Sequence, residues 1–158
     1  MGAVLRLKIE KIQMESRQPF YFLFNRLKDE DKKMGKKKIL LIDDEAGLTR
    51  LMKLNLEATE KYEVRVENKG TLAVKVAKEF KPDMIFLDII MPDLEGSEVA
   101  RQMRVDPGLK NIPIVFLTAT ITAEEISLGN GSIGGETFLA KPVTIKQMVD
   151  CIKRKVGE

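Results

Sequence analysis

The stretch DMIFLDIIMPDLEG, residues 83–96, places one carboxylate inside an otherwise apolar run. From Met84 to Met91 every residue except Asp88 is hydrophobic, which is typical of a buried strand. Burying an unpaired carboxylate costs on the order of several kcal/mol or forces the group to take up a proton. We therefore expect Asp88 to end the strand or to have a cationic partner.

Short apolar runs alternate with segments of helical periodicity from Lys38 onward. This alternation is typical of βαβ units, in which helices cover both faces of a parallel sheet. The sequence therefore predicts an α/β fold. Its expected strands are Ile39–Ile42, Val64–Val66, Met84–Leu87, Ile114–Leu117 and Phe138–Ala140. The second run is short and alternates with polar residues, which favours a place at the edge of the sheet.

Two capping boxes indicate where the last helices begin. Thr144 and Gln147 precede a strongly periodic apolar segment, and Thr122 and Glu125 open an earlier helix. Four glycines follow that earlier helix between residues 129 and 135. Because each glycine inside a helix costs about 1 kcal/mol relative to alanine, we expect this helix to be short or loosely held.

The composition is that of one ordinary globular domain. The chain has 158 residues, of which 44% are hydrophobic and 32% are charged. Its single cysteine, Cys151, cannot form an intramolecular disulfide, and no signal peptide or apolar run of roughly 20 residues is present. These features favour a cytoplasmic protein that does not bind a membrane.

The distribution of charge argues against nucleic-acid binding. The formal charge is +3, and residues 1–35 hold eight Lys and Arg against five Asp and Glu, whereas residues 36–158 hold nineteen of each. A neutral body lacks the basic face that neutralises phosphates. The chain has no histidine, which excludes His-based metal sites, Ser-His and Cys-His nucleophile pairs and a phosphohistidine of its own. If phosphate chemistry occurs here, another protein must supply the histidine.

Residues 1–35 do not follow the alternation and are expected to form an N-terminal extension. Leu5, Ile9 and Ile12 have helical spacing, but a proline soon interrupts the pattern. Three interpretations remain open for this segment. It is a leader upstream of a natural start at Met34, a helix that binds a partner or a second copy, or a disordered tail.

Polar residues follow four of the five predicted strands. Asp43 and Asp44 follow the first strand, Asp88 the third, Thr118 the fourth and Lys141 the fifth. The carboxyl ends of parallel strands form one edge of a sheet, so we expect these side chains to converge. Three carboxylates repel one another unless a hard divalent cation such as Mg²⁺ neutralises them. The pattern therefore indicates phosphoryl chemistry with an Asp nucleophile.

Each of these residues also has a structural explanation of its own. An Asp pair or a Thr after a strand is often the N-cap of the next helix, and Lys141 before Pro142 could be an ordinary loop lysine. The functional interpretation is favoured because all five residues lie at the same end of four different strands.

The stretch from Lys36 to Glu158 resembles the receiver domain of two-component response regulators, in particular the stand-alone members of the chemotaxis type. The motifs that carry the resemblance are LLIDDE (40–45), LDIIMPDLEG (87–96), FLTA (116–119) and FLAKP (138–142). The resemblance implies a flavodoxin-like fold. In that fold a five-stranded parallel sheet of order 2-1-3-4-5 is flanked by five helices.

The resemblance also implies a role for each matching residue. Asp88 would accept a phosphoryl group from a sensor histidine kinase or a phosphotransfer protein. Lys141 would contact a phosphate oxygen, and the Lys141–Pro142 bond would be cis. Thr118 and Phe138 would act as the switch residues that respond to phosphorylation. The implied Mg²⁺ ligands are Asp43, Asp44, Asp88 and the backbone carbonyl of Ile90.

The stretch SLGNGSIGGET (127–137) departs from the family pattern and puts the usual output face in doubt. Because only a residue or two follow the last predicted helix, we expect the output to be an unidentified downstream protein. The chain would be a signalling receiver, not a separate enzyme, that catalyses its own phosphorylation and dephosphorylation, as a monomer or weak homodimer. The alternatives are an interaction module that works without phosphorylation, and an Asp-nucleophile phosphatase. The phosphatase would need a second Asp where this chain has Ile90.

Overall fold

The computed structural model describes residues 35–129 and 131–157. The strands in this part are β1 (Lys37–Ile42), β2 (Tyr62–Glu67), β3 (Met84–Asp88), β4 (Ile114–Thr118), β5 (Ser132–Ile133) and β6 (Glu136–Ala140). The helices in this part are α3 (Ala46–Glu57), α4 (Gly70–Phe80), α5 (Gly96–Val105), α6 (Ala123–Leu128) and α7 (Ile145–Val156). The expectations for the N-terminal extension fall on residues 1–34, which lie outside the described residues, and they stay predictions.

The sheet confirms the predicted parallel order and adds one strand to it. Its order is β2-β1-β3-β4-β6-β5, and the first five of these strands run parallel, with β2 at one edge as predicted. We expected five strands, but the sheet has six within the described residues, because the two-residue β5 pairs antiparallel with β6.

The additional strand arises from the glycine-rich stretch. Gly134 and Gly135 adopt φ values of +60° and +86°, as the two central residues of a type I′ turn do. The turn folds Ser132–Ile133 back onto Glu136–Thr137. The glycines therefore build a hairpin as well as ending the preceding helix, whereas their sequence pattern by itself indicates only the end of a helix.

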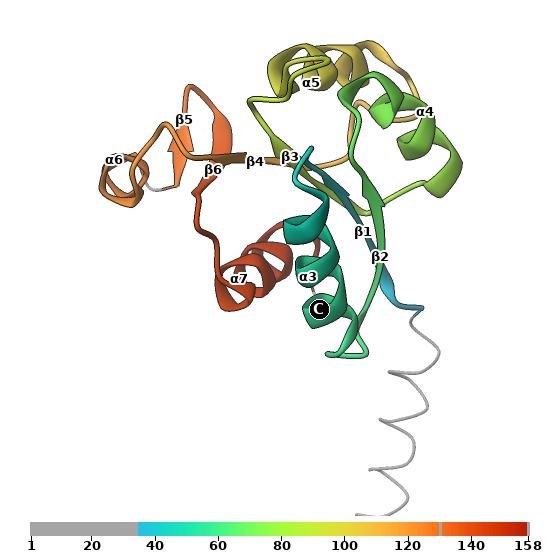
Figure 1. Cartoon of the computed structure of the whole chain (residues 1–158), viewed down its shortest axis with the longest axis horizontal. Coiled ribbons are helices and arrows are strands. Elements are labelled where there is room, and N and C mark those ends of the chain that lie inside the picture. The colour runs from blue at the N-terminus through green and yellow to red at the C-terminus, as the bar shows by residue number, and fades with distance from the viewer. Residues whose placement is uncertain (1–34, 130, 158) are drawn as a thin grey trace, which may run out of the picture. The chain divides into compact units, whose positions relative to one another are not determined.

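Helices cover both faces of the sheet. Helices α3 and α7 lie on one face and α4 and α5 on the other (Figure 1). Alternate side chains of β1 point to opposite faces of the sheet. Leu40 and Ile42 pack toward α4 and α5. Ile39 and Leu41 pack toward α3 and α7. Every residue of β3 is buried, which explains its unbroken apolar run.

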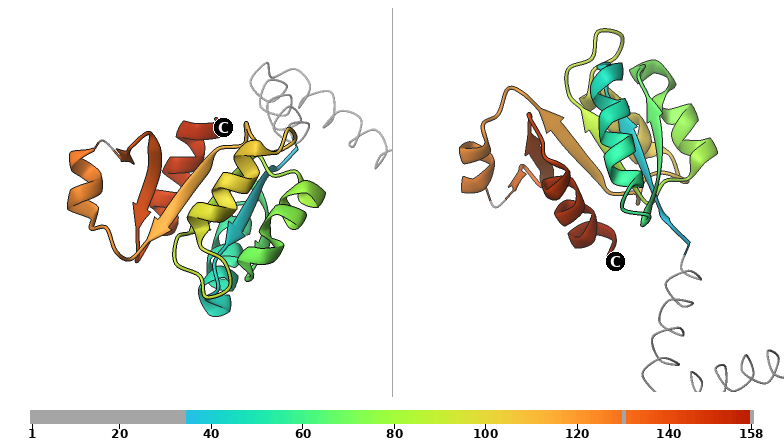
Figure 2. Two further views of the ribbon diagram at one scale, coloured as in Figure 1. Left: turned by 90° about the horizontal axis from the view of Figure 1, so that it is seen from above. Right: turned by 60° about the horizontal axis from the view of Figure 1, so that its bottom comes forward.

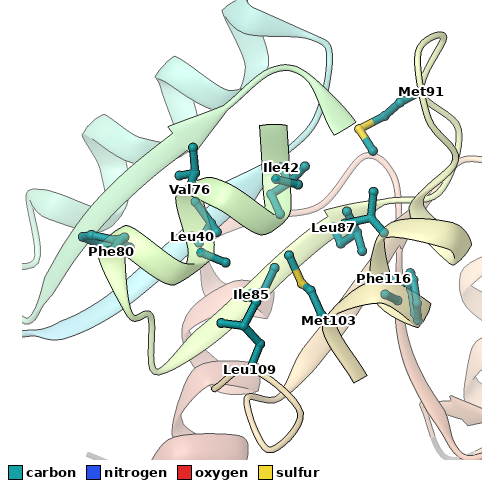
Figure 3. Packing of buried hydrophobic residues seen from close by; sticks show 14 residues of the cluster. Leu40, Ile42, Val76, Phe80, Ile85, Leu87, Met91, Met103, Leu109 and Phe116 are labelled. Carbon is teal, nitrogen blue, oxygen red and sulfur yellow. The ribbon is translucent and has the colours of Figure 1, made fainter. Parts of the chain in front are cut away.

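The core behind the central strands fixes the end of β3 (Figure 3). Ile85 and Leu87 of β3 point into a cluster that also contains Val76 of α4 and Met103 of α5. Each fully buried aliphatic side chain stabilises the fold by about 1.5–3 kcal/mol relative to an exposed one. This packing holds the backbone at Asp88 in a fixed position.

Helix α6 is short, as predicted. It spans six residues, Ala123–Leu128, and begins with the capping box formed by Thr122 and Glu125. It lies beyond the β5–β6 hairpin, away from the other helices (Figures 1 and 2). Leu128 at its end is 88% exposed.

The capping box of Thr144 and Gln147 also forms, at the start of α7. Across the described residues, we find no helix with the length and apolarity needed to cross a membrane.

Candidate functional site

The predicted polar residues lie together at the carboxyl ends of four strands, β1, β3, β4 and β6. Asp88 and Thr118 are the last residues of β3 and β4, while Asp43 and Lys141 directly follow β1 and β6. Asp43, Asp88 and Thr118 are only 1%, 6% and 1% exposed. The neighbouring strands are tied together at this edge, since the amide of Lys141 donates to the carbonyl oxygen of Thr118 at 2.7 Å.

Lys141 is the cationic partner that the sequence analysis required for Asp88. Its Nζ lies 2.6 Å from Oδ2 of Asp43 and 3.3 Å from Oδ1 of Asp88. A third acid, Glu45, places Oε1 at 3.3 Å from the same ammonium. Sequence reasoning gave Glu45 no role, although it directly follows the two aspartates of the first motif.

The surroundings of the site shift the pKa values of both Asp88 and Lys141. Burial raises the pKa of Asp88, the nearby Asp43 raises it further, and the charge of Lys141 opposes both effects. Burial by itself would lower the pKa of Lys141, but its close contacts with the carboxylates of Asp43 and Asp88 and their negative charges leave it above its ordinary value. Lys141 therefore remains an ammonium, and one ammonium does not neutralise all the carboxylates around it.

The acidic residues fit a divalent cation. Asp43, Asp44 and Asp88 each offer one carboxylate oxygen, and these oxygens lie within 4.8 Å of one another. Within the described residues, the buried Oδ2 of Asp43 receives no well-directed hydrogen bond, although it forms the ion pair with Lys141. A buried carboxylate oxygen without a directed donor is suited to a hard cation, which prefers oxygen ligands. This cluster could bind a metal ion.

The loop after β3 is closed by Gly96. Its amide donates to the carbonyl oxygen of Ile89 at 2.8 Å. A Cβ at position 96 would lie 2.1 Å from the carbonyl oxygen of Asp88, so glycine is required for this close approach. The side chain of Ile90 in this loop is 62% exposed. The proposed role of its backbone carbonyl as a metal ligand stays a prediction.

The two expected switch residues lie on neighbouring strands. The hydroxyl of Thr118 is 2.8 Å from that of Thr120 and accepts a hydrogen bond from the Thr120 amide at 3.1 Å. Phe138 of β6 is half-buried and stacks on Phe116 of β4, with ring centroids 5.4 Å apart. The Lys141–Pro142 bond is cis, as the resemblance implies. The switching role of Thr118 and Phe138 stays a prediction.

Two further residues near the site, besides Glu45, were not predicted from the sequence. Asn68, which follows β2, donates to the carbonyl oxygen of Asp43, and Asp93 accepts from the amides of Gly70 and Thr71. Asn68 also lies at the carboxyl end of a strand, and that position was the available signal. No comparable local signal points to the partners of Asp93.

The comparisons with known proteins agree with this geometry. The family described as Response regulator receiver domain matches residues 39–153. DNA-binding response regulator MtrA of Mycolicibacterium paratuberculosis is 31% identical over 121 residues, which cover 77% of this chain and 52% of that protein. The chain thus spans about half the length of this DNA-binding relative. Polar-differentiation response regulator DivK of Brucella anthropi is 28% identical, over 77% of this chain and 98% of that protein.

Solved structures show the same fold. Chemotaxis protein CheY4 of Vibrio cholerae superposes with a TM-score of 0.65 at 26% identity, covering 77% of this chain and 99% of that one. The signal receiver domain of a signal transduction histidine kinase from Syntrophus aciditrophicus gives a TM-score of 0.63 at 26% identity, covering 76% of this chain and 89% of that one. From its sequence, its fold and the arrangement of its polar residues, the chain belongs to the response regulator receiver domain family of two-component signalling.

Proposed function

We propose that Asp88 accepts a phosphoryl group in the presence of Mg²⁺ and that its modification changes a protein-binding surface. The observation that carries this proposal is the convergence of charge around Asp88. Its carboxylate lies with those of Asp43 and Asp44 within 4.8 Å, and the ammonium of Lys141 is 3.3 Å away. Such a cluster suits a nucleophile whose product carries additional negative charge.

The donor would be a phosphohistidine on another protein, because this chain contains no histidine. Receiver domains take their phosphoryl group from histidine kinases or phosphotransfer proteins, and we assign the same class of donor here. A carboxylate oxygen of Asp88 would attack the phosphorus as the bond from phosphorus to the imidazole nitrogen breaks. The electron pair of that bond returns to the nitrogen, and the product is an aspartyl phosphate.

The surrounding residues would hold the reacting groups. Mg²⁺, when bound, would offset the negative charge of the phosphoryl oxygens. Its ligands would be Asp43, Asp44, Asp88 and the carbonyl of Ile90. Lys141 would hold a phosphoryl oxygen, and its short ion pair with Asp43 would keep the ammonium in place during the transfer.

Phosphorylation would then be read through Thr118 and Phe138. The hydroxyl of Thr118 would exchange its contact with Thr120 for a phosphoryl oxygen, and the half-buried ring of Phe138 would turn inward. This change would bias the surface formed by α6, β6 and α7. We propose that an unidentified downstream protein binds that surface and that the chain is a monomer or weak homodimer.

Position 90 separates this function from that of a phosphatase. An Asp-nucleophile phosphatase uses a second acid two residues after the nucleophile, and this chain has Ile90 there. Isoleucine can neither accept nor donate a proton. We therefore propose that the aspartyl phosphate is a signalling state and not an intermediate in the turnover of a separate substrate.

Acetyl phosphate supplies a direct test because it phosphorylates without a partner protein. The full chain is incubated with acetyl phosphate, with and without Mg²⁺, and its intact mass is measured. The same is done for Asp88→Asn and for Asp150→Asn, a matched control whose carboxylate lies on the exposed side of α7. We expect one phosphoryl group on the original chain and on the Asp150 variant, with Mg²⁺ present, and none on the Asp88 variant.

Two results would contradict the proposal. A folded wild-type chain that gains no mass would favour an interaction module that works without phosphorylation. A gain that persists in Asp88→Asn would place the modification on another residue.

A further inference from the structure

The β2–α4 turn, defined here as residues 68 and 69 with the first two residues of α4 (68–71), contacts both loops that carry the predicted metal ligands. One is the β1–α3 loop, residues 43–45, and the other is the β3–α5 loop, residues 89–95. The turn itself contributes none of the predicted ligands.

The first contact is made by Asn68. Its Nδ2 donates to the carbonyl oxygen of Asp43 at 2.6 Å and to Oγ1 of Thr49 at 3.0 Å. The carbonyl of Asp43 belongs to the peptide bond that joins it to Asp44, so this hydrogen bond fixes the orientation of the peptide between two predicted ligands. Thr49 is buried, and its hydroxyl also lies 3.2 Å from the carbonyl oxygen of Ala46 in the first turn of α3.

The second contact is made by Asp93, which caps α4 from the β3–α5 loop. Its carboxylate accepts from the amide of Gly70 at 3.1 Å, the amide of Thr71 at 3.0 Å and the hydroxyl of Thr71 at 2.9 Å. The side chain of Lys69, the residue at the N-cap position, makes no capping hydrogen bond among the described residues. Asp93 therefore satisfies amide groups that the start of the helix would otherwise leave unpaired.

The loop also packs directly on the start of α4. A Cβ at Gly70 would lie 2.7 Å from the carbonyl oxygen of Leu94 and 3.0 Å from Cε of Met91. Met91 is buried, so the contact is continuous with the core. The β3–α5 loop is thus held against α4 by hydrogen bonds on one side and by close packing on the other.

We propose that Asn68 and Asp93 are positioning residues, through which the β2–α4 turn holds the β1–α3 and β3–α5 loops in register for the metal ion. This inference rests on the proposed function, because it assumes that the acidic cluster binds Mg²⁺. Three neighbouring carboxylates repel one another without a cation, and the repulsion acts to separate the two loops. The turn opposes that separation, so less reorganisation is needed when the ion binds.

The test measures Mg²⁺ affinity by isothermal titration calorimetry on the full chain. The variants are Asn68→Ala, Asp93→Ala and Asp93→Asn, and unfolding by urea without Mg²⁺ checks that each is folded. Outer partners of metal ligands typically change affinity by roughly tenfold or more. We expect about that loss for Asn68→Ala and Asp93→Ala, and a smaller loss for Asp93→Asn, whose amide oxygen can still accept from the start of α4.

A matched control separates positioning from general destabilisation. Asp106→Asn removes a carboxylate that also ties a helix to a loop, since Asp106 pairs with Lys78 of α4 at 2.5 Å and accepts from the amide of Gly108. It follows the end of α5 in the connection that leads into β4, so it lies on the side where the strands begin, whereas the acidic cluster lies at their carboxyl ends. We expect its Mg²⁺ affinity to stay within about twofold of that of the original chain. A loss equal to that of Asn68→Ala would overturn the inference.

The same experiment distinguishes a failure of this inference from a failure of the proposed function. If the original chain binds Mg²⁺ and the Asn68 and Asp93 variants bind it equally well, the positioning role is wrong while the metal site stands. If the original chain does not bind Mg²⁺, both proposals are wrong. Asp93→Asn and Asp93→Ala with equal losses would show that the charge of Asp93 acts at long range, and that result would also overturn the positioning role.

Discussion

Asp43 and Lys141 form a buried ion pair, with Oδ2 of the first 2.6 Å from Nζ of the second. This distance is shorter than the 3.3 Å between Lys141 and Asp88. Lys141 is therefore anchored mainly by an acid other than the proposed phosphoryl acceptor. An ammonium held in this way could contact a phosphoryl oxygen on Asp88 without losing its first partner.

Removal of the ammonium should destabilise the protein. Lys141→Met leaves Asp43 and Asp88 buried beside each other without their cation. Breaking a buried ion pair by removing one partner costs about 3 kcal/mol or more. We expect the free energy of unfolding, measured with urea at pH 7 without Mg²⁺, to fall by about that amount, and Mg²⁺ to restore part of it.

Lys146→Met is the control for this prediction. Lys146 pairs with Asp150 at the same distance of 2.6 Å, but its side chain is 84% exposed. Exposed pairs of this kind contribute less than about 1 kcal/mol. Equal losses for Lys141→Met and Lys146→Met would show that burial does not determine the strength of the first pair.

The raised pKa of Asp88 gives stability a predictable dependence on pH. Because burial raises this pKa above its ordinary value of 3.8, the folded state holds the proton more tightly than the unfolded state. The stabilising contribution is present below about pH 3.8 and is lost as the pH rises through the folded-state pKa. Asp88→Asn should therefore be more stable than the original chain at pH 7 without Mg²⁺, by a margin that narrows toward pH 4.

Urea unfolding of the original chain and of Asp88→Asn between about pH 4 and pH 7 measures this difference in stability. With Mg²⁺ present at pH 7, the original chain should become the more stable of the two, since the ion stabilises it more than the variant. If the stability difference between Asp88→Asn and the original chain did not change with pH, the raised pKa of Asp88 could not be its cause.

The parallel sheet and the acidic cluster could be predicted because both leave local signals. A fully buried strand such as β3 appears as an uninterrupted apolar run, and a site at the sheet edge appears as a polar residue directly after that run. Asp88 combines both signals at one position. The short α6 could also be predicted, from the glycines that follow its capping box.

The missed features depend on contacts between distant residues. Glu45 meets Lys141 across 96 positions, and Asn68 meets Asp43 across 25. Contacts between residues so far apart leave no repeating pattern in a single sequence, unlike the periodicity that reveals a helix or a strand. Strand β5 was not predicted for another reason, because a pair of glycines can either end a helix or form a type I′ turn, and the preceding capping box favours the first.

Asp93 should stabilise the protein with the opposite pH dependence to Asp88. Hydrogen bonds from Thr71, first from its amide, lower the pKa of Asp93 from 3.8 to about 2. The stabilising contribution is therefore present above about pH 4 and is lost as the pH falls toward 2. We expect the original chain to be more stable than Asp93→Ala at pH 6, and we expect this advantage to shrink between about pH 4 and pH 2. Urea unfolding of both proteins across this range measures it, and an advantage that persists unchanged at the lowest pH would refute the assignment.

Gly96 should be intolerant of even one additional carbon. A Cβ there would lie 2.1 Å from the carbonyl oxygen of Asp88, which is backbone and cannot move aside alone. Gly96→Ala should cost about 1–3 kcal/mol of unfolding free energy and should weaken Mg²⁺ binding, because the β3–α5 loop must shift. Gly47→Ala is the matched control, since a Cβ at Gly47 in α3 meets nothing within 4 Å among the described residues. It should be neutral or stabilising by up to about 1 kcal/mol. If the two variants unfold at the same urea concentration, the close approach at Gly96 does not constrain the loop.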